Sequence, residues 1–67
     1  MTNGELATIR ALDKCRFGHR AFDLRFVRDL RWKALHEPWH TLTRRQQYAL
    51  AAIAYRYRRQ LVRLLST

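Results

Sequence analysis

Residues 43–65 read TRRQQYALAAIAYRYRRQLVRLL, a run that contains neither Gly nor Pro. Thr43 and Gln46 stand at the spacing of a capping box, in which each side chain accepts a hydrogen bond from the backbone N–H of the other residue. No strong helix breaker follows this start. The pattern therefore predicts one continuous helix over about residues 44–65, which would be about 33 Å long.

This predicted helix has an apolar face and a basic face. At 100° per residue, its apolar residues fall within a sector of about 120°. They are Leu50, Ile53, Ala54, Tyr57, Leu61 and Leu64. Nearly opposite them lies a set of arginines, here called the basic stripe, which consists of Arg45, Arg56, Arg59 and Arg63. The sequence thus predicts a core-facing side and a charged side on one helix.

Two tyrosines lie on the flank of the basic stripe. Tyr48 and Tyr55 are seven residues apart and stand alongside Arg44. A tyrosine ring can stack on a nucleobase while a neighbouring guanidinium binds a phosphate. The alternative is that both rings pack against the second helix or the loop, with their hydroxyls in water.

The N-terminal part of the chain predicts another helix. Thr2 and Glu5 stand at capping-box spacing, so we expect a helix over about residues 3–17. Gly18 is expected to end it, because glycine readily takes the positive φ that follows many helices. The apolar face of this helix would consist of Leu6, Ile9 and Leu12.

A third helix is predicted between these two, over about residues 20–36. Four residues that recur every four positions are expected to form its buried face. They are Phe22, Phe26, Leu30 and Ala34. Pro38 cannot continue the helix and disfavours helical geometry at the residue before it, so we expect a loop at about 37–42.

The predicted fold class is all-α: a small three-helix bundle with a long C-terminal helix, forming a single domain over residues 1–67. A chain of 67 residues buries only about 60% of the surface that its unfolded form exposes. A roomy enclosed active site is therefore not expected.

Charge is the most unusual property of the chain. Its 14 Lys and Arg residues against 5 Asp and Glu give a net charge of +9. The acidic residues stop at Glu37, whereas residues 38–67 carry six arginines. The last helix can therefore form no ion pair within itself. This asymmetry favours a polyanionic partner.

The helix over 20–36 repeats the basic and aromatic pattern more weakly. Arg25, Arg28, Trp32 and His36 share the side away from Phe22 and Phe26. The two tryptophans, Trp32 and Trp39, are expected to act as core or loop anchors. The predicted nucleic-acid-binding residues are Arg25, Arg28, Arg44, Arg45, Tyr48, Tyr55, Arg56, Arg59 and Arg63.

The sequence predicts neither export nor a membrane span. Cys15 is the only cysteine, which excludes an internal disulfide framework and suits a reducing compartment. The first 20 residues contain no apolar run of signal-peptide length, and no stretch approaches 18 uninterrupted apolar residues. We therefore expect a cytoplasmic protein that does not associate with membranes, in the host cell if it is encoded by a phage.

No catalytic, metal or cofactor site is predicted. Four potential zinc ligands stand in two pairs, each with a spacing of four: Cys15 with His19, and His36 with His40. Pro38 breaks the helical geometry of the second pair, and Cys15 is expected to be a buried apolar residue. The carboxylates are scattered among basic residues rather than clustered, which disfavours acid–base and metal-dependent hydrolysis.

Residues 42–50 resemble the opening helix of the helix-turn-helix motif in several bacterial regulators. That motif needs a turn and a recognition helix afterwards. The predicted uninterrupted helix to residue 65 excludes this register. The alternative, the helices on either side of the 37–42 loop, has a connection longer than the usual tight turn.

Three segments together resemble a pattern found in a known group of proteins. They are Phe26-Val27-Arg28-Asp29-Leu30, Leu42-Thr43-Arg44-Arg45-Gln46, and Leu50-x-x-Ile53-x-x-Arg56-Tyr57. The pattern is similar to that of short helical proteins of phages and prophages, including the small protein encoded beside the UvsW helicase in T4-type phages. The resemblance covers about half of the chain and implies a phage origin and a role associated with nucleic acid.

Two function classes follow. The first is a small, basic, non-catalytic module that binds the phosphate backbone of DNA or RNA with little sequence specificity. The second is a phage-encoded inhibitor, such as an anti-CRISPR protein, that binds an acidic surface or a nucleic-acid site of a host defence complex. An exposed Leu or Tyr on the long helix also allows a homodimer.

Overall fold

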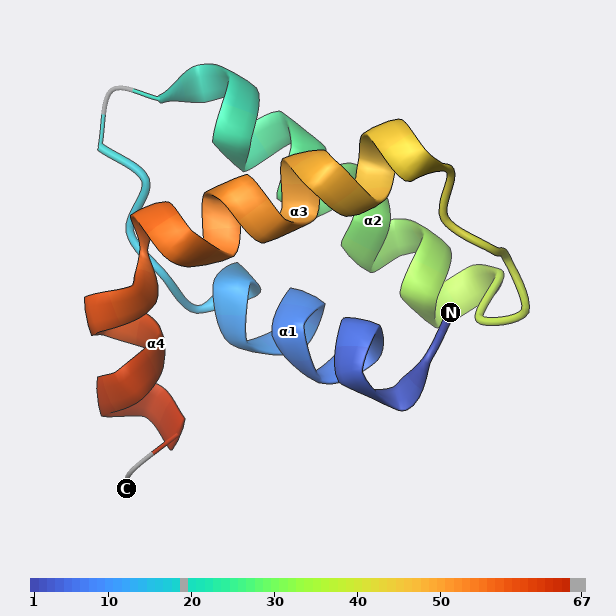
Figure 1. Cartoon of the computed structure of the whole chain (residues 1–67), viewed down its shortest axis with the longest axis horizontal. Coiled ribbons are helices and arrows are strands. Elements are labelled where there is room, and N and C mark those ends of the chain that lie inside the picture. Colours follow the sequence, from blue (N-terminus) through green and yellow to red (C-terminus); the bar gives the residue numbers. More distant parts are fainter. Residues whose placement is uncertain (19, 66–67) are drawn as a thin grey trace.

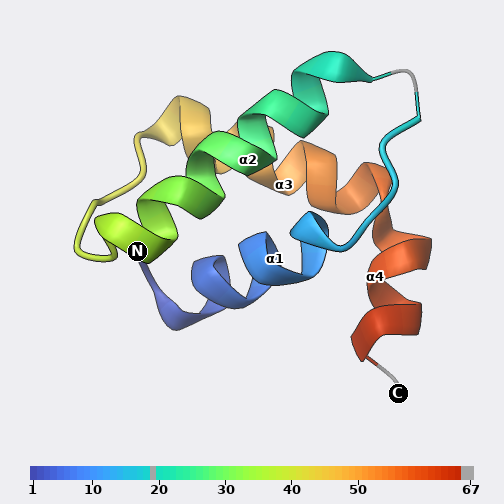
Figure 2. The same ribbon diagram turned by 180° about the vertical axis from the view of Figure 1, so that it is seen from behind.

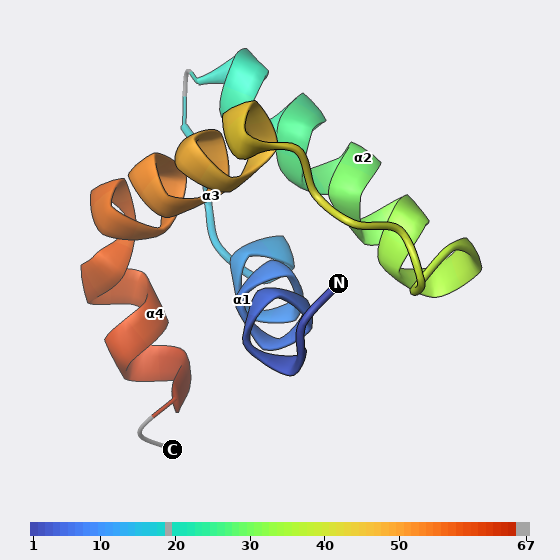
Figure 3. The same cartoon turned by 45° about the vertical axis from the view of Figure 1, so that its right-hand side comes forward.

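In the computed structural model, which describes residues 1–18 and 20–65, the chain folds into four α-helices. They are α1 (Asn3–Asp13), α2 (Ala21–His36), α3 (Arg44–Arg56) and α4 (Arg58–Leu65). Figure 3 shows α1 nearly end-on, with the other three helices arching around it. The fold is all-α, and none of the helices in the described ranges has the length and apolar character that a membrane span needs.

The core lies between α1 and this arch. Ile9 and Leu12 of α1 are fully buried, and α2 and α3 each add two buried residues. The segments between helices supply the rest, which makes the core Ile9, Leu12, Cys15, Phe17, Val27, Leu30, Leu42, Leu50 and Ile53. The prediction that Cys15 is buried and that Leu50 and Ile53 face the core is confirmed.

Both predicted capping boxes are present. Thr43 Oγ1 accepts a hydrogen bond from the Gln46 N–H at 3.2 Å, and Gln46 Oε1 accepts one from the Thr43 N–H at 2.9 Å. Thr2 and Glu5 make the equivalent reciprocal pair at the start of α1. Local sequence therefore fixes where α1 and α3 begin, because these bonds satisfy backbone donors that the helix itself leaves unpaired.

The predicted bounds of α2 and of the loop after it are confirmed. This loop lies beside the start of the chain, as the view in Figure 2 shows. The amino group of Met1 donates hydrogen bonds to the carbonyl oxygens of Pro38 and His40, at 2.9 and 2.7 Å. The first residue thus ties α1 to the end of α2.

The first helix is shorter than predicted, since α1 ends at Asp13 rather than at residue 17. The next backbone N–H groups, of Lys14 and Cys15, bond to carbonyls three residues back, which is the tighter 3₁₀ pattern. This turn lets Cys15 and Phe17 enter the core. Gly18 does take a positive φ of 57°, but it does so within the segment between α1 and α2.

The predicted buried face of α2 is wrong by one position at its start. Phe22 is 68% exposed and Phe26 is only half-buried, whereas Asp23, Val27 and Leu30 are buried. The prediction considered only the spacing of apolar residues, and this spacing places Phe22 on the buried face. The helix is instead rotated so that an acidic residue, Asp23, faces the interior, and the Phe22 and Phe26 rings stack on each other outside with centroids 6.0 Å apart.

The single long C-terminal helix is also wrong, because the chain bends at Tyr57 between α3 and α4. A straight helix of about 33 Å would exceed the longest dimension of the molecule, 28 Å. In Figure 1, α4 turns away from the axis of α3 and descends past the end of α1. No glycine or proline causes this bend, so its cause lies in tertiary contacts.

Two contacts to the segment after α1 hold the bend. The Gln60 side-chain amide pairs with the backbone of Arg16: its oxygen accepts from the Arg16 N–H at 2.9 Å, and its nitrogen donates to the Arg16 carbonyl at 3.0 Å. The Tyr57 ring meets the Phe17 ring edge-on, with centroids 4.9 Å apart. The Gln60 amide satisfies both backbone groups of Arg16, which a straight helix would leave without this partner.

The register of α2 can be tested by two substitutions. Leu30→Ala removes a fully buried side chain, so we expect it to lower the free energy of unfolding by about 2–5 kcal/mol. Phe22→Ala removes an exposed ring and should change it by no more than about 0.5 kcal/mol. Urea denaturation followed by circular dichroism measures both. If Phe22→Ala lowered the free energy of unfolding more than Leu30→Ala, the result would support the register expected from apolar periodicity and contradict the observed one.

Candidate functional site

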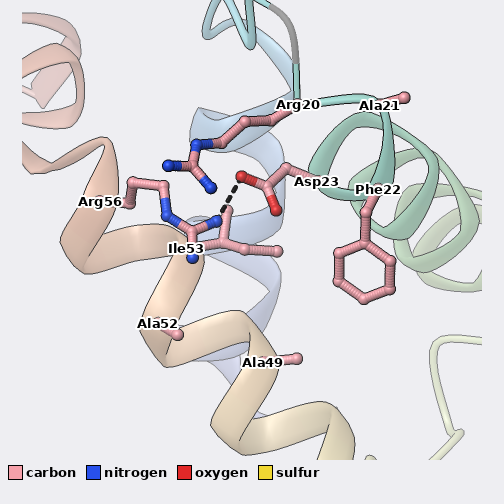
Figure 4. Close-up of a pocket in the computed structure, with 8 residues that line it drawn as sticks. All are labelled: Arg20, Ala21, Phe22, Asp23, Ala49, Ala52, Ile53 and Arg56. Atoms are coloured by element: carbon pink, nitrogen blue, oxygen red, sulfur yellow. Dashed lines mark hydrogen bonds and ion pairs between the residues drawn. The ribbon is translucent and has the colours of Figure 1, made fainter.

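A buried carboxylate organises the corner where α2, α3 and α4 meet. The Asp23 side chain is only 4% exposed. Its Oδ2 accepts a hydrogen bond from the Arg56 guanidinium at 2.5 Å and one from the Tyr57 hydroxyl at 3.1 Å. Figure 4 shows the Arg20 guanidinium on the same side of this carboxylate. A charge taken out of water needs such partners, and here they come from the end of α3.

The Tyr57 hydroxyl is held in its protonated form. Burial raises the pKa of Tyr57, and the hydrogen bond to Asp23 and the negative charge of that carboxylate raise the pKa further. The positive charges of Arg20 and Arg56 act in the opposite direction. The hydroxyl also lies 3.3 Å from the Phe17 carbonyl oxygen, but its single proton can serve only one acceptor at a time.

The basic stripe does not form one straight line on one helix. The bend at Tyr57 leaves Arg45 on α3 and carries Arg59 and Arg63 onto α4. Arg56, between them, pairs with Asp23. The structure therefore gives Arg56 a structural partner that helical periodicity did not predict.

On α3 the structure brings together the predicted arginines and tyrosines at the solvent-facing side. Arg44, Arg45 and Tyr48 are exposed, and the Tyr48 ring is 74% exposed. Tyr55 is exposed as well, but the Arg58 guanidinium stacks over its ring, 4.1 Å from the centroid. One face of Tyr55 is thus already occupied, and Tyr48 is the more open stacking platform.

Arg63 of α4 lies beside two basic residues that are not among the predicted binding residues. An open depression of about 440 Å³ separates α4 from the end of α1. Its lining consists of Lys14, Arg16, Gln60, Arg63 and Leu64. Lys14 and Arg16 are 49 and 47 residues from Arg63 in sequence, and only the bend brings them close, so no local pattern could have identified them.

Arg25 and Arg28 form a separate basic surface on α2. Both are exposed, on the side of the helix opposite Val27 and Leu30. Trp32 is on the same side and half of its surface is exposed, with its ring against that of His36 at a centroid distance of 4.6 Å. Trp39 is exposed as well. The expectation that the two tryptophans anchor the core or the loop is therefore wrong.

The acidic residues are engaged on the α1 and α2 side of the molecule. Asp13 pairs with Arg31 at 2.9 Å, and Asp29 pairs with Lys33 at 3.6 Å. Asp23 is held by Arg56 and Glu5 lies in its capping box, which leaves Glu37 as the acidic residue available to other cations. Among the described residues, no carboxylate forms an ion pair with Arg44, Arg45 or Arg59.

The residues considered as zinc ligands do not form a site in the described part of the chain, where no group of three or more His, Cys, Asp or Glu could hold a metal. His19 lies outside the described residues. Burial raises the pKa of the Cys15 thiol, which disfavours the thiolate that metal binding and nucleophilic attack require.

The uninterrupted helix to residue 65, which argued against a helix-turn-helix motif, is not present, because the chain is interrupted at Tyr57. However, α3 and α4 are separated by one residue, Tyr57, rather than by a turn of three or four residues. Gln60 of α4 is bound to the backbone of Arg16, and Leu61 packs against the core. One side of α4 is therefore committed to the fold.

The raised pKa of Tyr57 predicts a loss of stability in alkali. The folded state keeps a proton that the unfolded state releases near pH 10, so the contribution of Tyr57 is complete below about pH 10 and falls as pH rises beyond it. Tyr57→Phe should cost about 1 kcal/mol at pH 8, and its deficit relative to the wild type should narrow above pH 10. Urea midpoints of both proteins from pH 8 to 11.5 measure this. A deficit that stays constant would contradict the assignment.

The comparisons with known proteins add no further identification. Searches against models of protein families, curated proteins and solved structures find no match to this chain. The functional argument therefore rests on the chain itself. On α3 it rests on exposed arginines that have no carboxylate partner among the described residues, together with an open tyrosine, and between α4 and the end of α1 it rests on a cluster of cations.

Proposed function

We propose that this protein is a small, non-catalytic nucleic-acid-binding module that contacts the phosphate backbone with little sequence preference. The observation that carries this proposal is the separation of charge. Asp13, Asp23 and Asp29 are ion-paired and Glu5 serves in a cap, whereas within the described chain Arg44, Arg45 and Arg59 are exposed and form no ion pair with a carboxylate. Guanidinium groups suit phosphate because their planar donors match its oxygens.

The bend gives the proposed surface its shape. Arg44 and Arg45 with Tyr48 occupy the outer side of α3, and Arg59 lies just beyond the corner on α4. A backbone that follows α3 from its first turn to the bend would meet Arg44 and Arg45 at one end and Arg59 at the other. The open Tyr48 ring offers a stacking contact that tolerates any base. Contacts of this kind position a nucleic acid but do not distinguish its sequence.

A second candidate function is the binding of an acidic surface on a host protein, in keeping with the phage origin that the sequence resemblance implies. One observation favours it. Trp32, Leu35 and Trp39 are exposed within eight residues of sequence, and aromatic residues are enriched at protein–protein interfaces. Under this alternative, the arginines would steer the encounter and the two tryptophans would anchor it.

The first test is fluorescence anisotropy with labelled single-stranded and double-stranded oligonucleotides across a salt series. If four to six phosphates are engaged, the logarithm of the association constant should fall with the logarithm of salt concentration at a slope of roughly −3 to −5. Absence of binding at low salt would reject the proposal. The arginines would then be assigned to an acidic protein partner.

Substitutions locate the contacts. Arg45→Ala combined with Arg59→Ala should make the salt slope shallower by about 2, because about one unit is lost for each phosphate contact removed. The control is Arg10→Ala combined with Arg31→Ala, which removes the same charge from exposed positions on α1 and α2 that are not among the predicted binding residues. Circular dichroism checks that helicity is kept. Equal effects of the two pairs would mean that net charge alone, rather than this surface, determines binding.

Arg56 is unsuitable for charge reversal, because a glutamate there would face the buried Asp23.

A further inference from the structure

An open depression of about 460 Å³ lies between the first turn of α2 and the middle of α3. It is lined by Arg20, Ala21, Phe22, Asp23, Ala49, Ala52, Ile53 and Arg56. Figure 4 shows how these side chains are arranged. A volume of this order is within the range of small-ligand sites in proteins.

The two ends of the depression differ in chemistry. At one end the guanidinium groups of Arg20 and Arg56 flank the Asp23 carboxylate (Figure 4). Asp23 is already occupied by Arg56 and Tyr57. Two positive charges against one negative charge leave this end cationic, and the exposed Arg20 is the group that can bind a further anion.

The other end is apolar and open. The Phe22 ring forms one side, the methyl groups of Ala49 and Ala52 form the α3 side, and the buried Ile53 lies beneath (Figure 4). Phe22 is 68% exposed, so the core does not require it. Its stacking on Phe26 keeps the ring oriented, which reduces the entropy that binding would have to overcome.

We propose that this depression binds an unpaired nucleotide of a single strand, with the base between Phe22 and the two alanines and its phosphate at Arg20. A nucleotide contains a flat base, whose apolar face suits the apolar end of the depression, and a phosphate, whose negative charge suits the cationic end. A base within a duplex is stacked and paired, so it cannot enter. The inference rests on the proposed nucleic-acid-binding function and adds to it a preference for single strands.

The test compares three labelled probes by fluorescence anisotropy: oligothymidylate, a phosphodeoxyribose strand of equal length without bases, and a duplex. Wild-type protein should bind oligothymidylate most tightly. Phe22→Ala should weaken oligothymidylate binding about ten-fold, as expected for the loss of one base–aromatic stack. Its affinity for the strand without bases should not change, because the phosphate contacts remain.

Two further variants separate stacking from general effects. Ala52→Leu fills the depression from an exposed helical position and should reproduce the loss seen with Phe22→Ala. Trp39→Ala removes an equally exposed aromatic ring outside the depression and should bind oligothymidylate like the wild type.

The outcomes distinguish this inference from the function on which it rests. If the wild type binds all three probes equally with a steep salt dependence, and Phe22→Ala has no effect, the nucleotide site is rejected and backbone binding stands. An equal loss for oligothymidylate and for the strand without bases also rejects the site. If the wild type binds no probe, both the site and the proposed function are rejected.

Discussion

The carboxylate of Asp23 is the interaction on which the rest of this structure depends. It is buried in the first turn of α2, and its donors come from Arg56 and Tyr57, more than thirty residues later. Satisfying this one group fixes the rotation of α2, ties α2 to the end of α3 and places Tyr57 at the corner. The free energy of a buried charge without partners would exceed the whole stability of a small domain.

The bend at Tyr57 then determines the surface. Because α4 turns back along the end of α1, Arg63 joins Lys14 and Arg16 instead of extending the α3 surface into solvent. At the bend, Arg56 forms an ion pair with Asp23, so its charge is already neutralised within the fold. What remains are exposed arginines at the start of α3 and on α4, with two depressions near the bend that each have a cationic side. This geometry, more than the net charge, supports the proposed contact with a nucleic-acid backbone.

Sequence reasoning succeeded where the signal is local. The capping boxes at Thr2 and Thr43 located two helix starts, and Pro38 located the loop. It failed for three features that contacts between distant residues determine: the end of α1, the register of α2 and the bend. The bend depends on Gln60 meeting the Arg16 backbone 44 residues away, which no helical periodicity encodes. The same reasoning selected the exposed Arg44, Arg45 and Tyr48, but it could not separate Arg56 from them, because its partner is brought close only by the tertiary fold.

The most direct test of the central claim is a titration of ¹⁵N-labelled protein with unlabelled oligothymidylate, followed by two-dimensional NMR. The account predicts that amide shifts change at the start of α2, along the outer side of α3 and around the bend. It also predicts that the indole N–H signals of Trp32 and Trp39 stay in place. Changes confined to these tryptophans and the loop after α2 would contradict the proposed surface and place the nucleic-acid contact at the other end of α2. No changes at low salt would reject nucleic-acid binding and favour a protein partner.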